Sequence, residues 1–150
     1  GFTPAQAELA RTLTDSVDSA AEWLVDDWFN SAEKAVSDIV TGTLKGDDTT
    51  FTHVQTALVP LAGEPARARV LLAMLAQAWR DILLGRTGDA SVRFPGASEW
   101  QRLSQRYTTA KLLEVLDIVL AAPQRLQKNI SFQTTVESTV LESQFKLAGL

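Results

Sequence analysis

Apolar residues recur at three- and four-residue steps along almost the whole chain, the spacing that places them on one face of an α-helix. The clearest series spans residues 17–40 and consists of Val17, Ala20, Ala21, Leu24, Trp28, Ala32, Val36, Ile39 and Val40. No segment alternates between apolar and polar residues for long enough to predict a strand. The sequence therefore predicts an all-α protein, an irregular bundle of about six or seven helices.

Glycines, prolines and short polar residues divide this pattern into separate helices. Lys45–Thr49 is a glycine-containing polar turn, and Pro65 is placed to start the helix that Gly85 ends. In chain order, the expected helices cover residues 4–13, 17–40 (one helix, or two with a bend near Asn30), 51–61, 65–85, 98–107, 109–128 and 132–147.

Three polar residues are placed to cap helices. Ser98 follows the longest loop, residues 86–97, and can cap a short helix. Asn129 and Ser131 lie in the joint between the last two helices, where each is expected to cap a helix end for about 1 kcal/mol. Pro123 lies inside the helix before this joint, so a kink is expected there.

The composition excludes several classes of chemistry. The chain has no cysteine, which removes disulfides, thiol nucleophiles and zinc-thiolate sites. Its longest apolar run, residues 70–76, is far shorter than the roughly 20 residues of a membrane-spanning helix. Gly1 stands where an initiator Met would, without a basic and apolar leader, which predicts an excised fragment or a processed form. We expect a soluble, cytoplasmic protein.

Charge is distributed unevenly along the chain. Residues 1–63 carry three basic and ten acidic side chains, a balance of −7, whereas residues 64–150 carry eleven basic and eight acidic side chains, a balance of +3. Two solvated surfaces of different composition would explain this. The alternative is a chain with complementary ends for contact with partners. The net charge of −4 disfavours strong binding to duplex DNA.

No recognisable catalytic or cofactor-binding pattern occurs, so we expect no catalytic residue, metal or cofactor. The sequence has no phosphate-binding loop of the form Gly-x-x-x-x-Gly-Lys-Ser/Thr, and Lys45-Gly46 has the reverse of its Gly-Lys order. The single histidine, His53, is interpreted as structural rather than as a general base. Asp26-Asp27 and Asp47-Asp48 are interpreted as a solvated helix face and a turn, since adjacent helical side chains diverge too far to share a magnesium ion.

Three motifs occur in a fixed order. Asp26-Asp27-Trp28-Phe29 places a Trp-Phe pair after acidic residues, Trp79 to Leu84 reads Trp-Arg-Asp-Ile-Leu-Leu, and Arg125 to Ile130 reads Arg-Leu-Gln-Lys-Asn-Ile, followed by Glu137. Together they resemble the C-terminal region of the delta-prime subunits of the bacterial DNA polymerase III clamp loader. In that family the Trp-Phe pair opens the helix that leads into the domain, the second motif ends the central helix, and an Asn joins the last two helices. Pro123 departs from the family pattern.

The resemblance covers about Trp23 to the end. It implies that residues 1–22 are the tail of the preceding lid region and that residues 23–150 are a collar domain. Such a domain is a non-catalytic oligomerisation element. It holds delta-prime beside delta and an ATP-binding gamma or tau subunit in a five-membered ring, which loads the sliding clamp onto primed DNA. Contact with DNA would be indirect, through the assembled complex, and no small-molecule substrate is implied.

The alternatives are a stand-alone helical adaptor that binds a partner helix in a groove, and an enzyme that uses carboxylates.

Aromatic and basic residues supply the candidate partner contacts. Trp23, Trp28 and Trp79 are expected in the core, whereas Trp100, on a short helix after the long loop, is the expected exposed exception. Arg102 and Arg106 lie on the basic half of the chain. The predicted partner-binding residues are therefore Trp100, Arg102 and Arg106.

Overall fold

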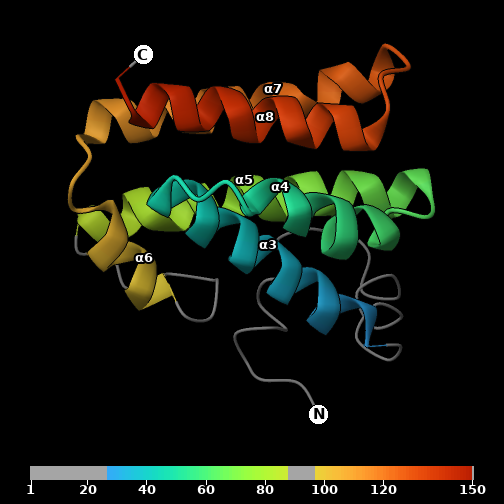
Figure 1. The fold of residues 1–150 in the computed structure, drawn as a ribbon, viewed down its shortest axis with the longest axis horizontal. Coiled ribbons are helices and arrows are strands. Elements are labelled where there is room, and N and C mark those ends of the chain that lie inside the picture. The colour runs from blue at the N-terminus through green and yellow to red at the C-terminus, as the bar shows by residue number, and fades with distance from the viewer. Residues whose placement is uncertain (1–26, 88–96, 150) are drawn as a thin grey trace.

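The computed structural model describes residues 27–87 and 97–149, and every regular element in these ranges is helical (Figure 1). The elements are α3 (Trp28–Lys45), α4 (Thr50–His53), the π-helical turn η1 (Val54–Leu58), the 3-10 turn η2 (Val59–Leu61), α5 (Pro65–Arg86), α6 (Ala97–Ser104), α7 (Thr109–Gln127) and α8 (Phe132–Leu147). The predicted all-α fold is confirmed. The helix predicted over residues 4–13, and Trp23, lie outside the described residues. No helix in the described ranges is long and apolar enough to span a membrane.

Helix α5 is the centre of the bundle. It packs against α7, α3 and α6, and Figure 1 shows α7 and α8 as a pair on one side of α5 while α3 crosses obliquely on the other. Because neighbours surround α5, its buried residues are spread around the helix rather than confined to one stripe. They are Ala68, Val70, Leu71, Leu72, Met74, Leu75, Ala76, Gln77, Ala78, Trp79, Asp81 and Ile82.

The start of α3 is fixed by Asp27, whose φ of 60° and ψ of −2° are left-handed. A helix cannot continue through such a residue, so the alternative of one unbroken helix over residues 17–40 is wrong. Helix α3 continues past Asn30 to Lys45, and residues 17–26 lie outside the described residues. Asp27 precedes the helix instead of lying on its face. The Trp28 indole then donates from Nε1 to the carbonyl of Leu61, at 3.0 Å, and Phe29 is buried beside it. These contacts tie the start of α3 to η2.

Helices α3 and α7 end in the same way. Gly46, with φ 68°, donates to the carbonyl of Thr43, and the next amide, Asp47 N, donates to the carbonyl of Gly42. At the end of α7, Asn129, with φ 64°, donates to the carbonyl of Leu126, and the amide of Ile130 donates to the carbonyl of Arg125. This pair of bonds around one left-handed residue satisfies the last carbonyls of a helix. Asn129 therefore caps α7 through its backbone conformation.

The predicted caps and breaks have mixed outcomes. Ser131 is confirmed, because its Oγ accepts a hydrogen bond from the amide of Thr134 at 3.1 Å. Ser98 is the second residue of α6, which begins at Ala97, and its side chain lies outside the described residues, so its capping role stays a prediction. Helix α7 continues through Pro123 to Gln127, and a kink there stays a prediction. The short helix predicted over residues 51–61 changes from α to π to 3-10 geometry before it ends at Leu61.

Candidate functional site

Trp100 is buried, with 1% of its surface exposed, so its predicted exposure is wrong. Helix α6 packs against both α5 and α3, and the indole donates from Nε1 to Thr41 Oγ1 of α3 at 3.0 Å. A short helix between two longer ones buries the face that carries its largest side chain. The enclosed indole offers a partner no contact area. Its role is to hold α6 against α3.

Arg102 and Arg106 are exposed, as a partner contact requires. Arg102 lies 4.0 Å from Glu99, one turn earlier on α6. Arg106, in the turn after α6, has its guanidinium carbon 5.5 Å from the centre of the Tyr107 ring. The Tyr107 hydroxyl donates to the carbonyl of Leu44, at 2.7 Å. The ring that supports Arg106 is thus fixed to the end of α3, and both arginines lie on one well-anchored edge, the α6 edge.

The α6 edge is positioned by Arg86, which the sequence did not single out. From the end of α5, its guanidinium donates to the carbonyl of Ser104 at 2.9 Å, to the carbonyl of Tyr107 at 2.8 Å and to Thr109 Oγ1 at 3.2 Å. One planar group with donors on three nitrogens can hold three separated acceptors at once, whereas the three donors of a lysine all lie on one nitrogen. Arg86 therefore fixes the turn between α6 and α7.

Two adjoining hollows lie along the seam between α5 and α7, and we call them together the α5–α7 groove. The first, of about 420 Å³, is lined by Pro65, Ala68, Leu126 and Phe132 among others. The second, of about 260 Å³, is lined by Ala73, Ala76, Arg80 and Leu120 among others. Arg69 and Pro123 line both hollows, so the two hollows adjoin. Its walls are mainly apolar and its charged groups are mainly arginines.

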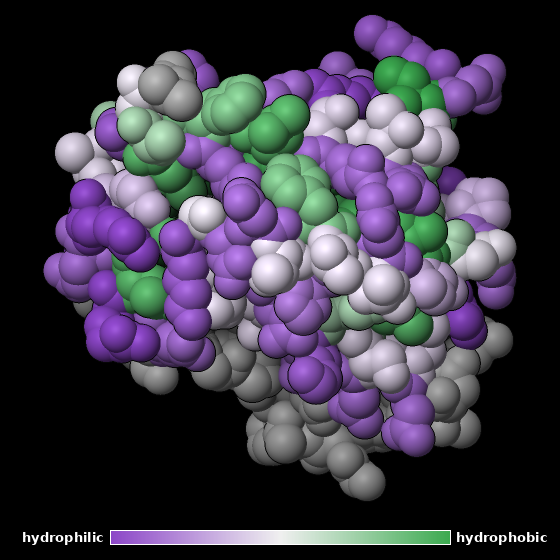
Figure 2. Space-filling model, viewed as in Figure 1, coloured by the Kyte–Doolittle hydropathy of each residue, from purple (hydrophilic) through white to green (hydrophobic). Residues whose placement is uncertain are grey.

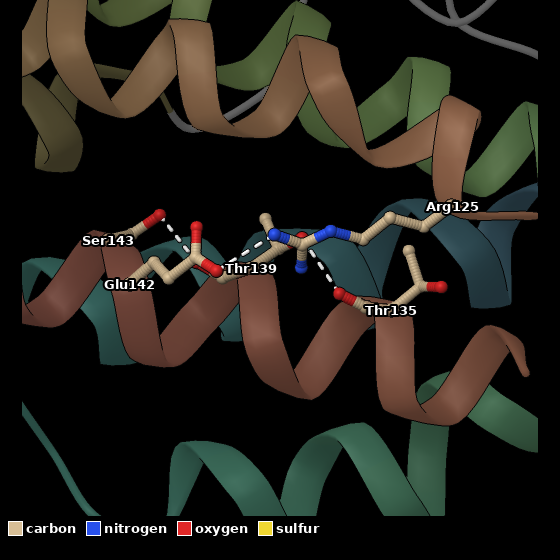
Figure 3. Close-up of polar contacts among 5 residues, drawn as sticks. All are labelled: Arg125, Thr135, Thr139, Glu142 and Ser143. Atoms are coloured by element: carbon tan, nitrogen blue, oxygen red, sulfur yellow. Dashed lines mark hydrogen bonds and ion pairs between the residues drawn. The ribbon is translucent and has the colours of Figure 1, made fainter. Parts of the chain in front are cut away.

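The inner face of α8 carries a row of small polar residues at four-residue steps (Figure 3). Thr135, Thr139 and Ser143 are all buried. Thr139 Oγ1 donates to the carbonyl of Thr135 and Ser143 Oγ to the carbonyl of Thr139, each at 2.7 Å. These bonds inside the helix allow small hydroxyls to be buried. Thr135 Oγ1 is buried and has no hydrogen-bond partner among the described residues. The row is a packing surface.

An ion pair closes α7 onto α8 beside this row. Arg125 extends from α7 so that its Nη2 lies 2.8 Å from Glu142 Oε1 of α8 (Figure 3). Lys146 and Glu114 form a second, longer contact of 4.0 Å. The outer surface of α8, part of the face seen in Figure 2, shows apolar side chains in small groups among hydrophilic ones. Leu141 and Phe145 of α8 are 42% and 49% exposed.

The carboxylates and the histidine form no cluster suited to a metal ion among the described residues. Asp47 is a turn residue, as predicted: its Oδ1 accepts from the amide and the hydroxyl of Thr49, each at 2.9 Å. These two bonds hold the pKa of Asp47 below its ordinary value, because they stabilise the carboxylate. His53 lies exposed at the end of α4. Asp26 lies outside the described residues.

No family model, curated protein or solved structure matches this chain.

Proposed function

We propose that the chain is the collar domain of a clamp-loader subunit of the delta-prime type, a non-catalytic oligomerisation element of the cytoplasmic replication machinery. The observation that carries the proposal is the joint at Asn129. The motif Arg125 to Ile130 forms the end of α7, and Asn129 makes the left-handed turn that leads into α8. The resemblance to the family implies an Asn that joins the last two helices at this point.

The other two motifs also lie at the ends of helices. Trp28 and Phe29 are the first two residues of α3, and both are buried. The run from Trp79 to Leu84 occupies the end of α5, the helix at the centre of the bundle. The first motif opens a helix and the second lies near the end of one, as the resemblance implies, and these positions support the proposal. Delta and gamma or tau subunits are the proposed partners, and no cofactor or small-molecule substrate is proposed.

The α6 edge is the proposed contact surface, through Arg102 and Arg106. Both side chains are exposed, and the turn beneath them is held by Arg86 and Tyr107. Complementary charge orients partners and sets their register. A rigid basic edge therefore suits an acidic surface on a neighbouring subunit.

Mixing the chain with the delta and gamma or tau subunits tests the proposal by size-exclusion chromatography. The wild-type chain is expected to co-elute with them, and Arg102→Glu with Arg106→Glu is expected to reduce co-elution while circular dichroism shows an unchanged helical fold. Lys34→Glu with Lys45→Glu, on exposed positions of α3, is the control with the same change of net charge. Full co-elution of the arginine variant would reject the α6 edge as the contact. Absence of co-elution for the wild-type chain would reject the collar function itself.

The alternative function is a stand-alone adaptor that binds a partner helix, and the α5–α7 groove is the observation that favours it. An adaptor would elute separately from the clamp-loader subunits in the same experiment.

A further inference from the structure

We propose that the α5–α7 groove binds an amphipathic helix whose flanks are acidic, supplied by a partner protein. This inference goes beyond the collar function and does not depend on it, because the groove and the α6 edge are separate surfaces.

The floor of the groove has two small residues between two arginines. Arg69, Ala73, Ala76 and Arg80 follow one another at three- and four-residue steps, so they lie on one face of α5. Ala73 and Ala76 leave space that a larger side chain would fill. Leu120, 43% exposed, and Pro123 form the opposite wall on α7. The result is an apolar trough bounded by two helices.

An arginine stands at each end of this floor. Arg69 and Arg80 are exposed, and neither forms an ion pair or hydrogen bond with another described residue. Glu64, at the far end of the groove, already pairs with Arg67 at 3.7 Å. The α7 wall supplies no charge, since its lining residues are Val119, Leu120, Pro123, Leu126 and Gln127. The groove therefore has an unbalanced positive charge along an apolar trough.

These features select the occupant. Apolar side chains at helical spacing can enter the two hollows, while carboxylates beside them meet Arg69 and Arg80. Pro65 and Arg80 lie about 22 Å apart along α5 at 1.5 Å per residue, which matches a helix of about four turns. No strand occurs among the described residues, so a peptide has no sheet edge to extend there, and helix-in-groove binding is the mode that fits.

A second copy of this chain fits less well. Among the described residues, the exposed large apolar side chains outside the groove are Leu113 of α7, Ile130 in the joint, and Leu141 and Phe145 of α8, so α8 alone carries two of them. The acids of α8 are already engaged: Glu142 binds Arg125 at 2.8 Å, and Glu137 accepts from Gln133 at 2.9 Å and from Gln55 at 3.1 Å. Charge complementarity therefore favours a partner that brings free carboxylates.

Fluorescence anisotropy with a designed probe tests the proposal on the 150-residue chain alone. The probe is a labelled helical peptide of about 16 residues, with leucines on one face and glutamates on its flanks, and the control peptide has lysines in place of the glutamates. The acidic peptide is expected to bind at least about tenfold more tightly than the lysine peptide, a difference of ~1.4 kcal/mol. Its affinity should fall as salt rises, because the charges are exposed.

Matched variants locate the site. Arg69→Glu with Arg80→Glu should weaken the acidic peptide at least about tenfold, whereas Lys34→Glu with Lys45→Glu, of equal net charge, should leave its affinity unchanged. Leu120→Gln should weaken binding, whereas Leu141→Gln should not, although the two leucines are exposed to the same degree, 43% and 42%. Equal loss from both leucine variants, or equal binding of both peptides, would overturn the proposal. The proposal would also be overturned if the wild-type chain self-associates and Leu120→Gln abolishes this self-association. In that case the occupant of the groove would be a second copy of the chain.

Discussion

Replacing Arg86 by Met is expected to destabilise the fold by about 2–3 kcal/mol. The variant keeps an unbranched apolar stem and removes the guanidinium, which donates to two carbonyls and one hydroxyl of the α6–α7 turn. Hydrogen bonds from a charged donor contribute roughly 1.5–3 kcal/mol each. The energies of the three bonds do not add fully. The bond to Thr109 is exposed, and water can reach the carbonyl of half-buried Tyr107 once the guanidinium is removed. The bond to Ser104, a fully buried residue, supplies most of the loss.

Urea unfolding followed by tryptophan fluorescence measures this change. For a domain of this size, ~2–3 kcal/mol corresponds to a lowering of Tm by about 5–10 °C. The dependence of the unfolding free energy on urea should be unchanged, since the surface exposed on unfolding is the same. Arg86→Lys should recover less than half of the loss, because an ammonium group cannot span three separated acceptors.

Arg102→Met is the matched control, because its side chain is 73% exposed and its nearest acid is 4.0 Å away. Its effect should stay within about 0.5 kcal/mol of the wild type. If Arg86→Met also stays within this range, or if Arg86→Lys is as stable as the wild type, the guanidinium does not hold the turn and the reasoning is refuted.

Local spacing predicted the helices well because it depends only on the period of the backbone. The stripe Val70, Leu71, Met74, Leu75 and Ile82 identified α5, and all five residues are buried. The same stripe could not reveal that α5 is also buried on its other sides, through Gln77 and Asp81. Polar residues on a helix usually mark the face that is exposed to solvent. Gln77 and Asp81 are exceptions, because Gln77 donates a hydrogen bond to Asp81 at 2.9 Å inside the bundle.

The breaks were harder to place than the helices. Gly46 was a clear signal, because glycine adopts positive φ readily. Asp27 gave no comparable signal. Aspartate is common at helix starts with ordinary backbone angles, so its residue type does not indicate a left-handed conformation. Asn129 was predicted as a cap on the strength of its type. That its backbone, rather than its side chain, would satisfy the carbonyls of α7 depends on the φ of one residue, which composition does not encode.

The candidate site depended on contacts between distant segments. Trp100, Ser104 and Tyr107 share the spacing of one helix face, and this regularity could have indicated that Trp100 lies inward. Arg86 had no such signal, because two of its acceptors are backbone carbonyls, which every residue possesses. The α5–α7 groove is equally non-local, since Ala73 and Ala76 leave a hollow only where Leu120 and Pro123 stand opposite.

Two further predictions concern single side chains. Asp47→Asn should reduce the loss of stability in acid: the lowered pKa of Asp47 means that its contribution is present above its ordinary pKa of 3.8 and is lost as pH falls through the lower folded value. An NMR titration that places the Asp47 carboxyl at or above 3.8 would contradict this. Thr135→Val should leave the fold unchanged or stabilise it by up to ~1 kcal/mol, because it removes a buried hydroxyl that has no partner without changing the shape of the side chain. Thr139→Val removes a hydroxyl that donates to the carbonyl of Thr135, so it should be the less stable of the two in urea unfolding. The reverse order would mean that the Thr135 hydroxyl is bonded in solution.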